Sequence, residues 1–197
     1  MEIVSQMLAK INWVDILIVL VSVRIIYVGI KNGFIMELFK LGGVVFAIFI
    51  SFHYYTKLSQ ILQNHSGISH GTADFLCFGF LWGVVVLIFK FIREGLMLVF
   101  KVEALSLVDQ WGGLLLSIIR GALTGSLVLV FLQVSGVEYW KNHARKSFFS
   151  LYLAQLSPKC YEATYEGIVS KFFPTEKLNP AVLKLKSETK DPKRSTQ

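Results

Sequence analysis

Four apolar runs in this chain each approach the length of a helix that crosses a lipid bilayer. Such a helix needs roughly 20 apolar residues, because the hydrocarbon core is about 30 Å thick. The runs cover approximately residues 13–30, 34–55, 73–92 and 112–134. Backbone polar groups in hydrocarbon must bond within their own segment, and the runs lack the alternation of a membrane β-strand. The sequence therefore predicts an all-α membrane protein with four transmembrane helices.

The composition excludes most soluble alternatives. Of the 197 residues, 54% are hydrophobic and 17% are charged, which is more apolar material than a soluble domain of this size can bury. The aromatic content of 14% excludes a disordered chain. A cleaved signal peptide is the alternative for the first run, but Arg24 interrupts it and no small-residue cleavage site follows. We expect the first run to remain as a helix.

The connections between the runs predict a helical hairpin and one longer loop. Lys31, Asn32 and Gly33 separate the first two runs, so the helices must be antiparallel, and Gly33 suits the end of the first helix. Residues 56–72 are polar and are expected to form a loop. The two histidines in that loop have no zinc-ligand spacing, and we expect no metal site. Asp109 is placed to cap the fourth span.

The sequence divides into three parts. Residues 1–136 form the predicted four-span transmembrane bundle. Residues 137–173 form an amphipathic helical region, either at the membrane interface or against the bundle, with a small soluble cap as the alternative. One apolar face of this region carries Tyr161, Tyr165, Ile168 and Phe172 at helical spacing. Residues 174–197 form a flexible basic tail that suits anionic headgroups. No nucleic-acid motif accompanies the tail.

Four charged residues in or near the predicted spans are intramembrane polar candidates: Asp15, Arg24, Glu37 and Arg120. An arginine near the bilayer centre costs roughly 2.5–3.5 kcal/mol on insertion scales, so it should face a partner or a wet cavity. We expect Arg24 to meet Glu37 across the hairpin and Arg120 to reach Asp15 or another subunit. The next helical turn offers Lys40 as an i, i+3 partner of Glu37. Asp15 suits a helix start, where an acid complements the helix dipole. These groups either lock the bundle or line a polar path.

Small residues indicate close helix contacts, because small side chains let helix backbones approach in lipid. The third span contains Gly79 and Gly83 in a GxxxG pattern, and the fourth contains Gly121 and Gly125 in another. Gly33 adds a small residue at the hairpin. We expect these five glycines to pack helices together, and self-association into a homo-oligomer is a further prediction.

No catalytic motif is present in the sequence. It contains no phosphate-binding loop, zinc-protease motif, nucleophile elbow or catalytic Cys/His grouping. We therefore expect no enzyme activity, no catalytic residue and no cofactor. Clustering of Asp15 with Glu37 would reopen the possibility of an intramembrane enzyme.

Two sequence blocks resemble the colicin V production protein (CvpA) family. The first block has Trp13 and Asp15 before the first span, then Gly33, Phe34 and Glu37 at the second. The second block is an aspartate followed by a glycine-rich helix with an Arg-Gly pair: Asp109, Gly112, Gly113, Arg120 and Gly121. The resemblance covers roughly Asn12 to Phe173.

The resemblance implies a multi-pass protein of the bacterial inner membrane, needed for colicin V production and linked to envelope homeostasis. It implies an accessory role in toxin export, with an unknown envelope or export protein as partner, and it supplies no catalytic residue. A small channel or transporter with a polar path through the bundle is the alternative. Loop lysines and arginines are nearly balanced between the two sides, so they assign no membrane orientation.

Overall fold

The computed structural model describes residues 12–99, 107–172 and 178–183. Three long helices dominate it: α2 (Trp13–Ser66), α3 (His70–Val99) and α4 (Leu107–Val134). Shorter elements follow: α5 (Glu138–Lys146), α6 (Ser150–Leu153), α7 (Leu156–Thr164), the π-helical η1 (Tyr165–Val169) and α8 (Ser170–Phe172). Within these described ranges there is no strand, which confirms the all-helical prediction.

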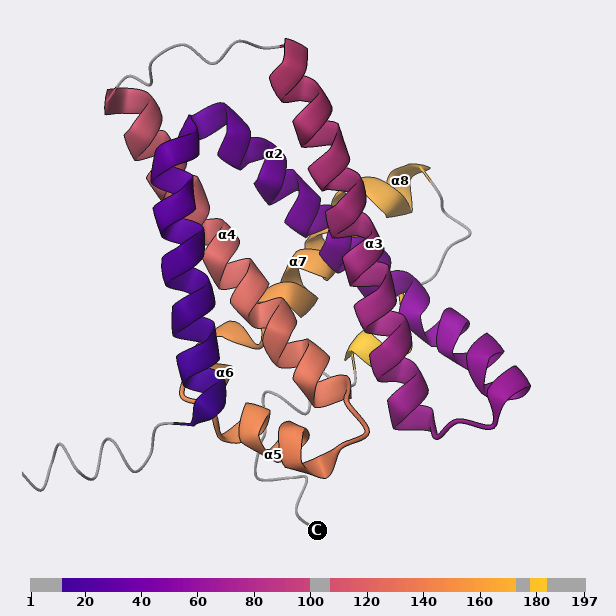
Figure 1. The fold of residues 1–197 in the computed structure, drawn as a ribbon. Coiled ribbons are helices and arrows are strands. Elements are labelled where there is room, and N and C mark those ends of the chain that lie inside the picture. Colours follow the sequence, from indigo (N-terminus) through magenta and orange to yellow (C-terminus); the bar gives the residue numbers. More distant parts are fainter. Residues whose placement is uncertain (1–11, 100–106, 173–177, 184–197) are drawn as a thin grey trace, which may run out of the picture.

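Helix α2 is a hairpin of two helical arms. Gly33 has φ 74° and ψ 175° inside it, a backbone conformation that is essentially restricted to glycine. The first arm (residues 13–32) and the second arm (residues 34–66) therefore run in opposite directions, as Figure 1 shows at the sharp bend of α2. The predicted turn at Gly33 is confirmed.

The second arm is longer than the sequence predicted. It continues through residues 56–66, which were expected to be loop, and only residues 67–69 separate it from α3. No glycine or proline interrupts residues 44–66, so nothing in the chain ends the helix earlier. It ends at Gly67, which adopts the left-handed conformation with φ 62° and donates its N–H to the Gln63 carbonyl. The predicted 17-residue loop was therefore wrong.

Two apolar clusters hold the bundle together. The larger one lies between the second arm, α3 and α4, and α7 adds Tyr161 to it; its other buried members are Ile48, Phe52, Tyr55, Phe78, Leu127, Val130 and Val182. The smaller one joins the start of the first arm to the end of α4 and to α5, through Val14, Ile18, Leu129, Leu132, Ala144 and Ala154. Figure 1 shows α7 behind α3 and α4.

The region after α4 lies against the bundle. The Ser157 N–H at the start of α7 donates to Ser126 Oγ over 2.8 Å, and the Tyr161 hydroxyl is 3.1 Å from His53 Nδ1. Asn179 donates its amide to the Phe52 carbonyl over 2.7 Å, and Val182 is fully buried. Residues 178–183 are thus packed, which corrects their assignment to a flexible tail. The rest of the predicted basic tail lies outside the described residues.

Most of the apolar surface of the long helices is exposed. Three helices within the described residues are long and apolar enough to cross a membrane, and only 17–39% of their most apolar stretches are buried. Leu20, Phe80 and Leu115 are 64%, 64% and 62% exposed. Contiguous apolar surface of this extent is unfavourable in water and favourable in lipid. The chain is therefore a membrane protein.

Candidate functional site: a buried ion cluster and a basic cavity

Glu37 is the centre of a buried ion cluster next to the hairpin. Its side chain is completely buried. One carboxylate oxygen, Oε1, lies 2.6 Å from Lys40 Nζ, and the other, Oε2, lies 2.7 Å from Arg120 Nη2. The Arg120 contact is an ion pair without hydrogen-bond alignment, since Oε2 has no donor in line with it. Two cations thus compensate a carboxylate that is costly to bury alone.

The same cluster ties three helical segments together. Asn32, just before the turn, donates its side-chain amide to the Val28 carbonyl over 2.7 Å and to Glu37 Oε1 over 3.3 Å. Arg120 Nη2 also donates to the Ile25 carbonyl over 3.4 Å. The first arm, the second arm and α4 therefore meet at one polar point inside an otherwise apolar bundle.

Asp109 caps the second arm of α2. The sequence predicted that it precedes the fourth span and caps it, but α4 begins at Leu107 and Asp109 lies within its first turn. Its Oδ1 accepts a hydrogen bond from the backbone N–H of Phe34 over 2.8 Å. Because Phe34 is the first residue of the second arm, that N–H has no partner within its own helix. A carboxylate there also complements the positive end of the helix dipole.

Backbone-to-backbone packing brings α4 against the hairpin. A Cβ on Gly113 would lie 2.7 Å from the Gly29 carbonyl oxygen and 3.0 Å from the Gly33 carbonyl carbon. A Cβ on Gly29 would in turn overlap the Ser117 side chain. Neither glycine leaves room for a methyl group. This close contact fixes the rotation of α4 about its own axis. In that rotation Arg120 faces Glu37.

The glycines predicted to pack helices differ in how closely they do so. A Cβ on Gly79 would lie 3.0 Å from the Phe131 ring, and one on Gly125 would lie 3.4 Å from both Ile18 and Leu153. A Cβ on Gly121 would lie 3.8 Å from Ile25 Cγ2, which is an ordinary van der Waals distance. Gly83 has nothing within 4 Å, so it makes no close contact with the described chain, and its role in self-association stays a prediction.

A second backbone contact was not anticipated from the sequence. A Cβ on Gly71, at the start of α3, would lie 2.5 Å from Gly136 Cα, just after α4. The two glycines are far apart in the sequence, and no local pattern connects them. Gly71 follows Gly67 in a GxxxG pattern within the polar stretch, and Gly136 lies between Ser135 and Val137.

The predicted partners of Arg24 and Arg120 were wrong. Arg120, not Arg24, meets Glu37. Arg24 is exposed and makes no hydrogen bond or ion pair within the part of the chain that the structure describes. Arg120 also contacts the carbonyl of Ile25, the residue after Arg24, so the guanidinium group from α4 occupies the space between the first arm and Glu37.

Asp15 has a structural role at the start of α2. It forms a capping box with Asn12, which confirms its place at a helix start. It accepts hydrogen bonds from the Ser147 hydroxyl and, over 3.3 Å, from the Phe149 N–H. These bonds join the first arm to the segment between α5 and α6, so the expected contact with Arg120 is absent. Asp15 and Glu37 lie at opposite ends of the first arm.

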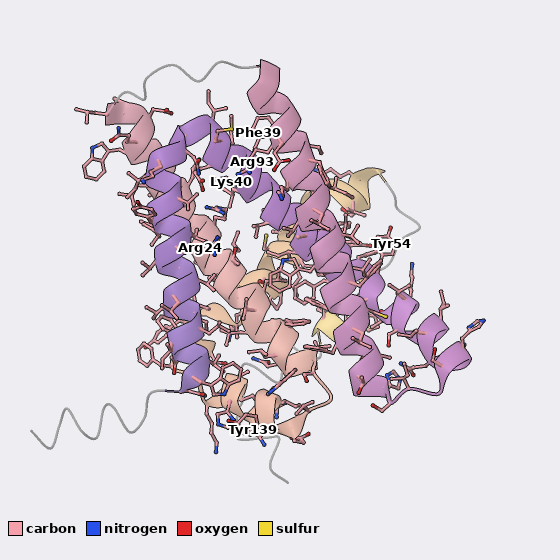
Figure 2. The ribbon with its side chains drawn as sticks, in the orientation of Figure 1. Arg24, Phe39, Lys40, Tyr54, Arg93 and Tyr139 are labelled. Atoms are coloured by element: carbon pink, nitrogen blue, oxygen red, sulfur yellow. The ribbon has the colours of Figure 1, made fainter. Side chains whose placement is uncertain are left out.

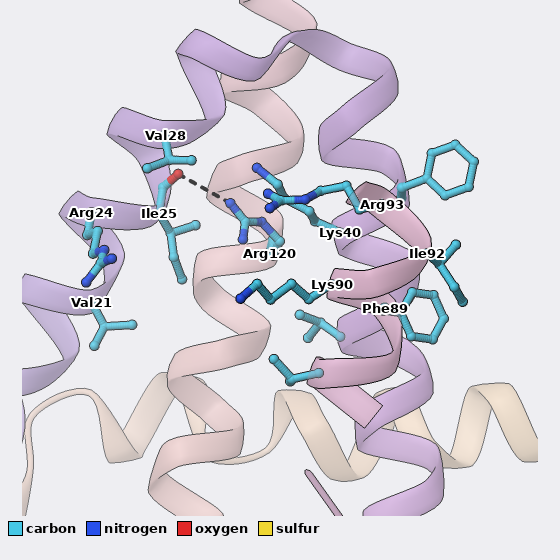
Figure 3. Close-up of a pocket in the computed structure, with 14 residues that line it drawn as sticks. Val21, Arg24, Ile25, Val28, Lys40, Phe89, Lys90, Ile92, Arg93 and Arg120 are labelled. Carbon is cyan, nitrogen blue, oxygen red and sulfur yellow. Dashed lines mark hydrogen bonds between the residues drawn. The ribbon is translucent and has the colours of Figure 1, made fainter. Parts of the chain in front are cut away.

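A cavity of about 540 Å³ adjoins the ion cluster. It lies between the first arm and α3, with the second arm and α4 contributing to its walls (Figure 3). We call it the basic cavity because five cationic side chains line it: Arg24, Lys40, Lys90, Arg93 and Arg120. Figure 2 shows Arg24, Lys40 and Arg93 in the half of the bundle near the hairpin, far from Tyr139 at the other end.

Sequence reasoning missed two of these five residues. Lys90 and Arg93 stand at i, i+3 at the end of the predicted third span, where they resemble ordinary interfacial cations. Their spacing places both on one helix face, which was the available signal. No group of metal-ligating side chains occurs among the residues searched within the described ranges.

Comparison with known families places most of the chain in one of them. The family model described as "Colicin V production protein" matches residues 14–158. No curated protein and no solved structure matches the chain. The matched segment contains the whole ion cluster, the Asp109 cap and all five cations of the basic cavity.

Proposed function

The chain belongs to the colicin V production protein family, and we propose that it is a multi-pass accessory protein of the bacterial inner membrane. In this role it supports colicin V production and toxin export, and it contributes to envelope homeostasis. It acts through contacts with other proteins within the membrane. The observation that carries the proposal is the family match over all of the long helices, combined with their exposed apolar surface.

Four membrane spans follow from the hairpin. The first arm is about 30 Å long at 1.5 Å per residue, enough to cross the hydrocarbon core. A straight α2 would be about 80 Å long, far more than one crossing needs. We therefore propose that the two arms, α3 and α4 are the four spans, with Gly33 at one membrane surface and residues 67–69 at the other.

We propose a non-catalytic role because each buried acid already has a structural task. Glu37 holds Lys40 and Arg120, and Asp15 holds the start of α2 against the segment after α5. The two carboxylates lie at opposite ends of the first arm and do not form the acid pair that an intramembrane hydrolase requires.

A small channel or transporter is the second candidate, and the basic cavity is the observation in its favour. Against it, the larger apolar cluster occupies the interior farther from the hairpin, where Ile48, Phe78 and Leu127 are buried. The cavity therefore ends inside the bundle. Purified protein in vesicles should leave chloride and proton flux unchanged; selective flux that Arg120→Gln abolishes would favour the channel.

The proposed partners are the surrounding lipid, an envelope or export protein of unknown identity, and a second copy of the chain. The exposed apolar faces of α3 and α4 are available for such contacts in the plane of the membrane. The open space at Gly83 suits the close approach of another helix.

The direct test is complementation. A colicin V-producing bacterium that lacks its own family member should regain toxin in the medium when it expresses this chain. Gly42→Ala, which adds a methyl group in open space, is the matched control for expression and should restore secretion equally. Gly113→Leu, which breaks the contact of α4 with the hairpin, should not. Failure of the unaltered chain, despite normal membrane levels, would contradict the proposed function.

A further inference from the structure

The basic cavity carries more positive charge than its carboxylates neutralise. Glu37 lies within ion-pair distance of two of the five cations, Lys40 and Arg120. Glu94 offers only marginal contacts, at 3.9 Å from Lys90 Nζ and 4.0 Å from Arg93 Nη2. Arg24 has no acidic partner in the described part of the chain. Five cations thus face two carboxylates.

Two guanidinium groups also have unused donors. The Nε atoms of Arg93 and Arg120 are buried and have no hydrogen-bond partner among the described residues. A buried donor without a partner is unfavourable, so an anionic oxygen in the cavity would stabilise both groups. Guanidinium donors match the geometry of phosphate oxygens particularly well.

The rest of the cavity wall is apolar. The cationic groups lie among Val21, Ile25, Val28 and Phe89 (Figure 3). Val44 also lines the cavity. Three further lining residues, Phe39, Val86 and Ile92, are 43%, 46% and 46% exposed. They extend the apolar wall onto the surface that faces lipid. A ligand that satisfies the whole cavity is therefore an amphiphile with an anionic head.

The cavity reaches from the hairpin end of the bundle toward its middle. Lys40 lies ~10 Å after Gly33 and Arg24 ~14 Å before it, measured along the helix arms at 1.5 Å per residue. With Gly33 at the membrane surface, both residues lie within the hydrocarbon core, where long cationic side chains extend toward the polar layer. A lipid phosphate bound here is therefore drawn below the level of the surrounding headgroups, toward cations that have too few carboxylates.

We propose that the basic cavity binds the phosphate group of an anionic phospholipid, whose acyl chains lie along Phe39, Val86 and Ile92. Basic pockets between transmembrane helices bind such headgroups in other proteins. A soluble phosphoester offers the same phosphate chemistry without the chains, and the experiment must separate the two sources. The inference rests on the membrane placement within the proposed function and is independent of toxin export.

The test is native mass spectrometry of the purified full chain in detergent, which counts bound lipids. Three probes are titrated: phosphatidylglycerol, phosphatidylcholine with the same acyl chains, and glycerol 3-phosphate. Arg24→Gln and Arg93→Gln remove cavity cations that the ion cluster does not use. Lys31→Gln removes an exposed cation that lies over the Tyr27 ring at the same end of the bundle, outside the cavity lining, and is the matched control.

The expected result is preferential binding of phosphatidylglycerol. Each cavity variant should weaken that binding about fivefold, and the double variant about 25-fold, because each cation contributes about a factor of five to the attraction. Lys31→Gln should leave the affinity unchanged. Glycerol 3-phosphate should bind weakly and should not displace the lipid.

Three results would overturn the proposal. The first is equal binding of phosphatidylglycerol and phosphatidylcholine, and the second is an unchanged affinity in a folded double variant. The third is competition by glycerol 3-phosphate at low concentration, which would make the ligand a soluble phosphoester. If the variants fail to fold, photocrosslinking decides: a phosphatidylglycerol analogue with a reactive acyl chain should label residues 86–92 of the unaltered chain, and labelling elsewhere alone contradicts the assignment.

Discussion

Arg120 on α4 lies 2.7 Å from the buried carboxylate of Glu37, just past the Gly33 turn of α2. This one contact joins the two blocks of sequence that carry the family resemblance. The Asp109 cap on Phe34 and the close approach of Gly113 to Gly29 join the same blocks. Gly33, Phe34 and Glu37 of the first block and Asp109, Gly113 and Arg120 of the second thus form a single structural unit at the hairpin end of the bundle. Trp13 and Asp15 of the first block lie at the other end of the first arm.

The ion cluster predicts unequal effects of its two main substitutions. Glu37→Gln leaves the partly buried Lys40 and Arg120 without a carboxylate, whereas Arg120→Gln leaves the Glu37–Lys40 pair intact. Removing one partner of a buried pair costs about 3–5 kcal/mol, so we expect Glu37→Gln to reach that range and Arg120→Gln to cost less. Thermal unfolding in detergent measures the difference. If Arg120→Gln destabilises the protein as much as Glu37→Gln, or more, then Lys40 does not share the carboxylate.

The Asp109 cap predicts a smaller, local effect. Asp109→Ala should destabilise the protein by about 1 kcal/mol, since the Phe34 N–H loses its acceptor. Asp109→Asn keeps an acceptor oxygen and should retain most of the stability. Hydrogen exchange at the start of the second arm is the measurement. Unchanged exchange in Asp109→Ala would mean that the cap does not hold this helix end.

The backbone at Gly33 predicts a conformational effect that does not depend on contacts. Gly33→Ala should cost about 1–3 kcal/mol, because residues with a side chain disfavour its φ of 74° with ψ of 175°. Gly42→Ala is the control, since it lies in a helix and has no atom within 4 Å of the added Cβ. The control should be neutral or slightly stabilising. Equal melting temperatures for both variants would contradict the observed turn.

The glycine contacts predict which glycine of α4 is indispensable. Gly113→Ala places a methyl group against the Gly29 carbonyl oxygen and should lower the melting temperature clearly. Gly121→Ala has ordinary space and should be tolerated. Crosslinking between cysteines introduced into the first arm and α4 would show whether the helices separate. Tolerance of Gly113→Ala with intact crosslinking would exclude the close approach.

The sequence predicted those features that depend on local chemistry. The apolar runs predicted helices, Gly33 the turn, Asp15 a helix start, and the spacing of Glu37 and Lys40 their ion pair. The partner of Glu37 was not predictable in this way. Arg24 and Arg120 are both single cations in apolar runs, and the choice between them depends on the rotation of α4, which Gly113 and Gly29 set through a tertiary contact.

The end of the second arm illustrates a different limit. Residues 56–66 are mostly polar, and this polarity predicts a loop. Their helix is stabilised by tertiary contacts instead: Ser59 is completely buried, and Thr56 Oγ1 accepts a hydrogen bond over 3.0 Å from the Asn179 amide. Asn179 comes from a segment that the sequence assigned to the tail. No local pattern connects these distant positions.

We propose that the two arms of α2 cross the membrane separately, and cysteine accessibility tests this placement directly. The background is a protein in which Cys77 and Cys160 are replaced by alanine. Lys31→Cys at the hairpin and Ser69→Cys between the second arm and α3 are labelled in sealed vesicles of known orientation with a membrane-impermeant maleimide. We predict that the two cysteines react from opposite sides of the membrane. Labelling of both from the same side, or shielding of Lys31→Cys until the bilayer is dissolved, would contradict the account.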